Sequence, residues 1–307
     1  MTLLIEYTFI FAIVLFLVAL GGCFSEHSGI VNLALEGIMV VGAMGGTVAM
    51  KIFDGVPGIL FTILVLLFTV LSGMLYSLLL AVPAIKYGAD QTLVGTALNI
   101  MAVAYATVYI KTQNIIYYGK SDAIIRFINE KECLYLNIFG ARVWVYTIIA
   151  VVCVVLSIFI MNKTRFGLRL RACGENPYSA ASAGVNVQKM RYAGVLISGA
   201  LGGLGGLAYI TASVSEWSFD KGVAGFGFLA LAVMIFGQWK PAFIALAAIM
   251  FGFFRALSNV YMGIDWLVAL NLPGAFYNLM PYVISLLILA FASGKSNCPK
   301  AEGQPYP

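Results

Sequence analysis

About nine apolar stretches constrain the fold of this chain more than any other feature of its sequence. A bilayer core of ~30 Å requires roughly 20 consecutive apolar residues in a helix. The chain is 62% hydrophobic and only 10% charged, far from the composition of soluble domains. We therefore predict an all-α, polytopic membrane protein with about nine (roughly 8–10) transmembrane helices. The apolar runs cover residues 6–23, 29–50, 57–80, 92–110, 143–162, 193–213, 222–238, 241–262 and 277–293.

Two of these runs are irregular. The run 222–238 is short for a spanning helix, and glycines interrupt the run 29–50, which is consistent with a broken helix. We interpret residues 1–307 as one transmembrane domain with two long polar loops, at 111–141 and 163–192.

Loop 163–192 carries the densest basic cluster of the sequence, against one acid, Glu175. Because basic loops stay on the cytoplasmic side, we predict that this loop is cytoplasmic. Counting spans outward places the N-terminus outside, the C-terminus inside and loop 111–141 outside. The net charge of +5 fits this topology and gives no indication of a nucleic-acid partner. The basic residues of the loop are Lys163, Arg165, Arg169, Arg171, Lys189 and Arg191.

The same loop contains the segment GENPYSAASAGV, residues 174–185, which predicts a short capped helix. Asn176 is a good N-cap, because its side-chain oxygen accepts a free N–H of the first turn. Pro177 follows at the first helical position, where a missing N–H costs nothing. Gly184 suits the left-handed residue that commonly ends a helix. A helix of about two turns on a polar loop indicates a docking element.

Small residues recur at helical spacing in GALGGLGGLAY. Gly199 and Gly203 form one i, i+4 pair, and Gly202 and Gly206 form another. Such faces let helix backbones approach closely. We interpret them mainly as packing within one bundle, with a subunit interface or a moving contact as the alternative.

Polar groups in or beside the apolar runs are candidates for a translocation path. Glu36 lies in NLALEG, and Asp90 and Asn99 both lie in YGADQTLVGTALN. A carboxylate at bilayer depth must face protein or water, so each group either lines a polar path or fixes the bundle by hydrogen bonds between helices. Arg255, in FGFFRALSN, is interpreted mainly as structural, with Asp265 as a possible partner.

No catalytic or metal site is evident in the sequence. The tripeptide GKS occurs at 119–121 and 294–296, but Asn114 and Leu289 replace the upstream glycine of a nucleotide-binding loop. The cysteines lack metal-ligand spacing, and we interpret Glu26 and His27 as a solvated or capping pair. We expect neither an enzyme nor a cofactor.

Three segments resemble the permease subunits of bacterial ABC importers in the branched-chain amino acid/ribose superfamily. They are SGIVNLALEGIMVVGAMGG (28–46), RACGENPYSAASAGVNVQKMRYAGVLISGALGGLGG (171–206) and GFGFLALAVMIFGQWKP (225–241). The resemblance covers roughly residues 10–293. Within the superfamily, NLALEG, YGADQTLVGTALN and the third segment look most like the nucleoside ("simple sugar") type, whereas the LPPFIVTLG-like segment of ribose permeases is not evident.

This resemblance implies a bacterial inner-membrane permease without ATPase activity. Its implied partners are a cytoplasmic ABC ATPase, a second identical or homologous permease, an extracytoplasmic substrate-binding protein and membrane lipid. It implies nucleosides or related ribosyl compounds as substrates, with riboflavin, simple sugars and branched-chain amino acids as alternatives. Residues expected to couple to the ATPase are Glu175, Asn176, Pro177, Tyr178, Ala180, Ala181 and Gly184.

Two other classes remain open at this stage. An ion-coupled secondary transporter commonly places ionisable groups and broken helices at the membrane midplane, and Glu36 fits that pattern. A channel or a structural membrane subunit is the third class. The capped helix on the basic loop favours the ABC permease.

Overall fold

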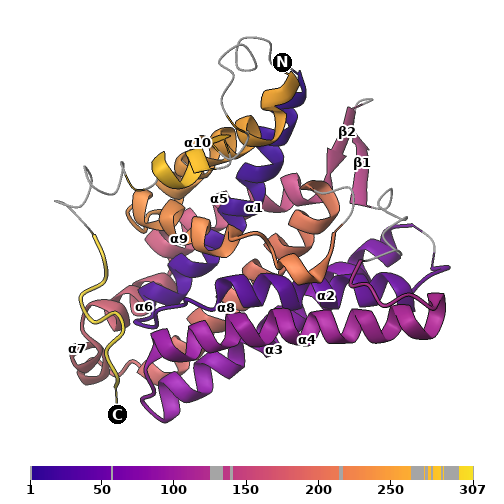
Figure 1. Cartoon of the computed structure of the whole chain (residues 1–307). Coiled ribbons are helices and arrows are strands. Elements are labelled where there is room, and N and C mark those ends of the chain that lie inside the picture. Colours follow the sequence, from indigo (N-terminus) through magenta and orange to yellow (C-terminus); the bar gives the residue numbers. More distant parts are fainter. Residues whose placement is uncertain are drawn as a thin grey trace.

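The computed structural model describes residues 2–56, 58–124, 134–138, 141–213, 217–263, 276–277, 279–284 and 297–306, with Pro273 and Leu286 (Figure 1). Within these residues the chain is almost entirely helical. The α-helices are α1 (Thr2–His27), α2 (Leu35–Ile52), α3 (Ile59–Lys86), α4 (Gln91–Tyr118), α5 (Val145–Lys163), α6 (Arg165–Glu175), α7 (Pro177–Ser182), α8 (Val187–Ala208), α9 (Phe226–Phe236) and α10 (Pro241–Val260). The other elements are β1 (Tyr135–Ile138), β2 (Ala141–Trp144), the π-helical turn η2 (Tyr209–Ser213) and the 3-10 turns η3 (Phe219–Lys221) and η4 (Tyr261–Gly263).

Seven helices within the described residues are long and apolar enough to cross a membrane: α1, α2, α3, α4, α5, α8 and α10. The predicted all-α membrane fold is therefore confirmed, whereas the count of about nine is not reached by the described residues. The last predicted span, 277–293, lies mostly outside them.

The prediction of a span at 222–238 is wrong. This run forms only α9, whose 11 residues rise about 16 Å, roughly half of a bilayer core. Three residues before it, Gly222, Ala224 and Gly225, have φ angles of 55°, 53° and 77°, and such left-handed conformations cannot continue a helix. The broken helix expected in 29–50 is not present: α2 begins at Leu35 after an irregular segment and then continues without a break through the glycines to Ile52.

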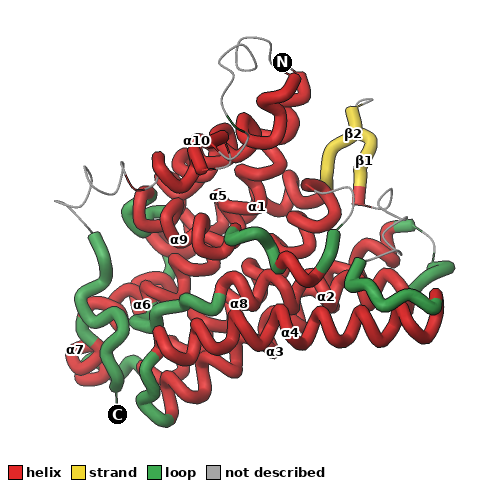
Figure 2. The backbone as a smooth tube through the Cα atoms, in the orientation of Figure 1, coloured by secondary structure: helices red, strands yellow, loops and turns green. Residues whose placement is uncertain are grey.

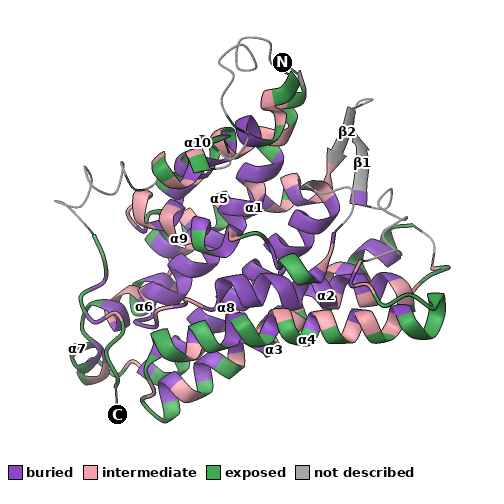
Figure 3. Cartoon of the chain, viewed as in Figure 1, coloured by how far each residue is buried: buried purple, intermediate pink, exposed green. Residues whose placement is uncertain are grey.

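The core of the bundle is formed by α1, α2 and α8, with α3, α4 and α5 on its outside (Figure 3). In the middle of α1, Val14, Leu15 and Leu17 are completely buried. An apolar stripe at i, i+4 spacing on α3 is exposed instead: Ile63, Leu67, Leu71 and Leu75. A stripe of this kind is costly in water and suits contact with lipid tails.

The described parts of the two polar loops lie at opposite ends of the bundle (Figure 2). Strands β1 and β2 form an antiparallel hairpin pairing Tyr135 with Trp144 and Ile138 with Ala141. Figure 2 shows this hairpin away from α6 and α7, which lie beside the C-terminal segment. We call the end formed by residues 163–191 and 297–306 the basic end, and the end formed by residues 119–124, 134–138 and 141–144 the hairpin end.

Candidate functional site

The short helix predicted on the basic loop is confirmed as α7. The Oδ1 atom of Asn176 accepts the N–H of Ser179 at 3.0 Å, and Pro177 occupies the first helical position. At the other end, the N–H of Gly184 donates to the carbonyl of Ala181 at 2.8 Å, and Gly184 has a φ of 80°. Local chemistry alone therefore fixes both ends of this helix.

The predicted coupling residues divide between two faces of α7. Pro177 and Ala180 are buried, Ala180 packing in a small apolar cluster with Cys173 and Val187, and Ala181 lies at its edge. The exposed members are Glu175, Asn176, Tyr178 and Gly184. Tyr178 is 59% exposed, so much of its side chain is accessible to a partner.

The pair Glu26–His27 is not solvated, contrary to the sequence interpretation. Both side chains bind the turn between α9 and α10: the indole N–H of Trp239 donates to Glu26, and His27 Nε2 lies 2.9 Å from the Trp239 carbonyl oxygen. The Glu26 and Glu302 carboxyl groups interact electrostatically, and burial raises the pKa of Glu302 above its ordinary value. The end of α1, the α9–α10 turn and the C-terminal segment therefore meet at the basic end.

Glu36 lies where two helices begin, and it caps one of them. Its Oε1 accepts the N–H of Gly225 at 2.9 Å, and its Oε2 accepts the N–H of Gly227 at 2.7 Å. These are free amides at the N-terminus of α9, where the helix dipole also favours a carboxylate. The side chain is 8% exposed, so it faces protein rather than lipid.

Asn99 completes this arrangement from α4. Its Oδ1 accepts the N–H of Gly37 and its Nδ2 donates to the carbonyl of Leu33, both at 2.8 Å. It therefore satisfies backbone groups on both sides of the start of α2. We call Glu36, Gly37, Asn99, Gly225 and Gly227 the α2–α9 junction.

The irregular segment 28–34 that leads into this junction is also held by side chains. Asn32 donates to Ser198 Oγ on α8 at 2.8 Å, and its Oδ1 accepts the N–H of Ala34 at 3.1 Å. The N–H of Val31 donates to Gln91 at the start of α4, at 2.7 Å. The segment is thus connected directly to α8, the helix that follows α7.

Asp90 does not join this cluster. Its exposed carboxylate caps α4, accepting the N–H groups of Thr92 and Leu93 at 2.8 and 3.0 Å. Its described hydrogen bonds stay within its own helix, so the structure does not bring it together with Glu36 and Asn99.

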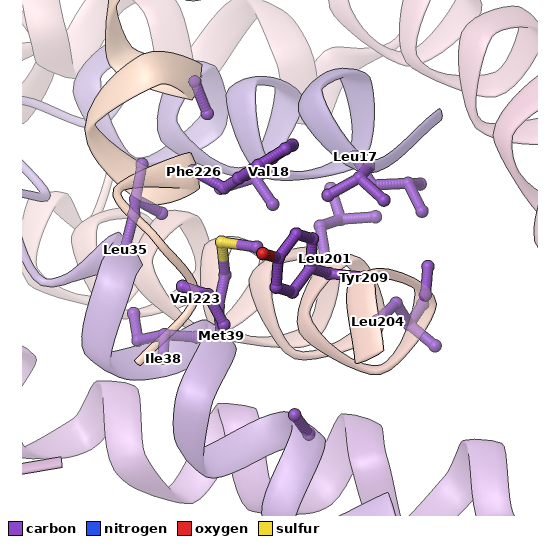
Figure 4. Close-up of a cluster of buried hydrophobic side chains, with 14 of the residues drawn as sticks. Leu17, Val18, Leu35, Ile38, Met39, Leu201, Leu204, Tyr209, Val223 and Phe226 are labelled. Carbon is purple, nitrogen blue, oxygen red and sulfur yellow. The ribbon is translucent and has the colours of Figure 1, made fainter. Parts of the chain in front are cut away.

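An apolar layer lies next to the junction (Figure 4), and Leu35, Ile38 and Phe226, which adjoin junction residues in the chain, belong to it. Side chains of α1, α2 and α8 meet the start of α9 there (Figure 4). The centres of the Tyr209 and Phe226 rings lie 4.6 Å apart. The guanidinium of Arg255 lies 5.1 Å from the centre of the Phe226 ring, an arrangement favourable for a cation and an aromatic face. Its predicted partner, Asp265, lies outside the described residues.

The four α8 glycines pack against helices of this same chain. A Cβ at Gly199 or Gly203 would meet α3, and one at Gly202 or Gly206 would meet α2. A Cβ at Gly206 would overlap the backbone of Met39. This geometry supports packing within one bundle rather than a subunit interface.

Sequence reasoning missed two residues of this site. Asn32 begins the NLALEG motif but was not singled out, although asparagine commonly binds backbone groups two residues later. Arg191 was counted as a loop charge, but its side chain is completely buried. Because the burial of Arg191 depends on contacts with distant parts of the chain, no local sequence signal identifies it.

The family sequence profile described as "Branched-chain amino acid transport system / permease component" matches residues 4–291. The chain is 37% identical to the guanosine ABC transporter permease protein NupQ of Bacillus subtilis, covering 100% of this chain and 97% of NupQ. It is also 37% identical to the nucleoside ABC transporter permease protein NupC of Lactococcus lactis, covering 97% and 94%.

A solved metal-chelate type ABC transporter in an inward-facing conformation shares the fold. The TM-score is 0.51 and the identity 15%, over 93% of this chain and 85% of the other. The chain therefore belongs to the permease family of branched-chain amino acid transport systems, a multi-pass membrane subunit of an ABC importer whose ATP is hydrolysed by a separate ATPase.

Proposed function

We propose that this permease imports nucleosides or related ribosyl compounds. The support is the likeness, over nearly the full length of each chain, to permeases named for guanosine and for nucleosides. Riboflavin, simple sugars and branched-chain amino acids are the alternative substrates within the same class of importer.

The coupling surface of the proposed importer is α7. The observation that carries this assignment is a helix capped at both ends, exposed at Tyr178 on a basic loop and followed by a helix that binds segment 28–34. Such a helix keeps its shape without help from a partner and transmits displacement as a rigid body. Its partner is a cytoplasmic ABC ATPase, so the basic end faces the cytoplasm and the N-terminus the outside of the inner membrane.

The assembly requires further partners. A second permease, identical or homologous, completes the path, and an extracytoplasmic binding protein delivers the substrate. Import then follows alternating access, in which the ATPase favours one of two bundle conformations that differ in affinity for the substrate.

Uptake of radiolabelled guanosine, uridine or adenosine is expected to depend on this chain and on ATP. Cells lacking the chain should lose uptake, and ATP depletion should abolish it while collapse of the ion gradient leaves it intact. Unlabelled riboflavin, ribose and leucine should not compete. Uptake of leucine or ribose alone would overturn the assignment of nucleosides as substrates, whereas uptake that follows the ion gradient would indicate a secondary transporter.

A cysteine placed at Ser179 is expected to crosslink to the ATPase. Ser179 is exposed on α7, and Lys120, exposed at the hairpin end, is the matched control. The experiment uses a background in which the exposed Cys298 is replaced by serine. A cysteine at Ser179 should crosslink in membranes and resist labelling from outside intact cells, and one at Lys120 should do the opposite. Labelling of the Ser179 position from outside would contradict the orientation.

A further inference from the structure

Arg191 is a buried cation whose described contacts come mainly from the C-terminal segment. Its Nη2 donates to the carbonyl of Gln304 at 3.0 Å, and its guanidinium lies 5.9 Å from the centre of the Tyr306 ring. Among the described residues, no carboxylate pairs with it, and its Nε and Nη1 have no hydrogen-bond partner. Burying a cation with so few partners is costly. The carbonyl of Gln304 and the ring of Tyr306 offset part of this cost and link Arg191 to the C-terminal segment.

The same segment binds two separate parts of the basic end through its backbone. The N–H of Ala301 donates to the carbonyl of Gly174 at the end of α6, at 2.8 Å. The N–H of Gly303 donates to the carbonyl of Gly29, in the segment that leads into α2, at 3.1 Å. Residues 301–303 thus connect the loop carrying α7 to segment 28–34, which leads into the α2–α9 junction.

Its two ends reach further elements. The ring of Tyr306 lies 5.3 Å from that of Tyr178 on α7, centre to centre. The backbone N–H of Asn297 donates to Oε1 of Gln238, in the α9–α10 turn, at 3.1 Å. We call residues 297–306 the C-terminal strap, because they contact α6, α7, α8, segment 28–34 and the α9–α10 turn.

A second connection is useful mechanically because only a short turn, residues 183–186, joins α7 to α8. Gly184 has a φ of 80°, and no atom lies within 4 Å of the position of a Cβ there. At this glycine, therefore, no side chain packs the turn against its neighbours. The strap bypasses this point, since it binds α7 and segment 28–34 directly.

We propose that Arg191 is a positioning residue that holds the C-terminal strap on the basic end, so that displacement of α7 is passed to segment 28–34 and the α2–α9 junction. The inference rests on the proposed coupling function of α7. Without Arg191, the strap loses its hydrogen bond at Gln304 and its cationic partner at Tyr306. The ATPase then still meets α7, but its movement is poorly transmitted.

The first test measures how firmly the strap is held on the basic end and does not depend on transport. Hydrogen exchange is followed in the purified full-length permease carrying Arg191→Met, Arg191→Lys or Lys189→Met. Methionine keeps an apolar stem of similar length but donates no hydrogen bond, and Lys189 is an exposed control on the same helix. Protection of the Ala301 and Gly303 amides should fall about tenfold in Arg191→Met, partly in Arg191→Lys and not in Lys189→Met. Unchanged protection in Arg191→Met would show that Arg191 does not hold the strap, whatever the substrate or partner of the permease.

The second test uses the complete transporter reconstituted with its ATPase and binding protein. In Arg191→Met, substrate imported per ATP hydrolysed should fall about tenfold, while ATPase association and hydrolysis persist. Arg191→Lys should recover part of this ratio, and Lys189→Met should match the parent protein. A loss of import in strict proportion to hydrolysis would indicate a merely structural residue and would overturn the positioning role. Failure of the parent protein to couple import to ATP would instead refute the proposed function. The hydrogen-exchange experiment would then still show whether Arg191 holds the C-terminal strap in place.

Discussion

Replacing Glu36 with alanine is expected to abolish import and to destabilise the permease by roughly 3 kcal/mol or more. The carboxylate accepts two N–H groups at the start of α9, at Gly225 and Gly227, and alanine leaves both buried donors without a partner. Hydrogen bonds to a charged acceptor are among the stronger ones, and the surrounding apolar layer leaves little water to replace them. Thermal unfolding in detergent and nucleoside uptake measure the two effects.

The variant Glu36→Gln sharpens this test, because an amide has only one acceptor oxygen. Its NH₂ group would face the second backbone N–H, donor against donor. Gln is therefore expected to lower stability and uptake together, to a level between those of the parent protein and Glu36→Ala. Glu6→Ala, which removes an exposed acid from α1, is the control and should change neither. Normal folding of Glu36→Gln with complete loss of uptake would instead indicate that the charge serves the translocation path.

The structure of α7 was predictable because the information for it is local. An Asn cap, a proline at the first position and a glycine after the last turn lie within nine residues of one another and need no tertiary contact. Asp90 carried an equally local signal, since aspartate before Gln91 is a good N-cap. Its interpretation as a residue beside a polar path gave more weight to the apolar run than to this capping pattern.

The shortness of α9 could not be read from its own sequence. The run 222–238 is apolar, and the helix is limited by left-handed residues that include Ala224, whose side chain gives no warning of that conformation. Its cap, Glu36, is 189 residues away from Gly225 in the chain. Arg191 is similar, because the carbonyl that covers it belongs to Gln304, 113 residues later. Charge counting places a loop on one side of a membrane but does not distinguish an exposed arginine from a buried one.

Replacing Gly203 with valine is expected to prevent assembly of the helix bundle. Gly203 lies where α8 meets both α2 and α3: a Cβ there would be 2.8 Å from the carbonyl oxygen of Thr69 and 3.5 Å from Cα of Gly42. The Thr69 oxygen belongs to the backbone and cannot yield as a flexible side chain can, and the contact with Gly42 leaves no room on the other side for the methyl groups of valine, so α8 must move away from α3. Overpacking of this kind costs about 3 kcal/mol. Because α8 also carries Ser198, which binds Asn32, separation would disturb the segment leading to the α2–α9 junction.

The matched control for Gly203→Val is Ala200→Val on the same helix. Ala200 is half-buried and lines a cavity of about 260 Å³, with Leu20 and Ser157, so added methyl groups there meet open space. Membrane-inserted, detergent-extractable protein and its unfolding temperature measure the outcome: Gly203→Val should yield little folded permease, and Ala200→Val should resemble the parent. If Gly203→Val folds normally and loses only the association with a second permease, the glycine face lies at a subunit interface, and the packing within one chain described here is wrong.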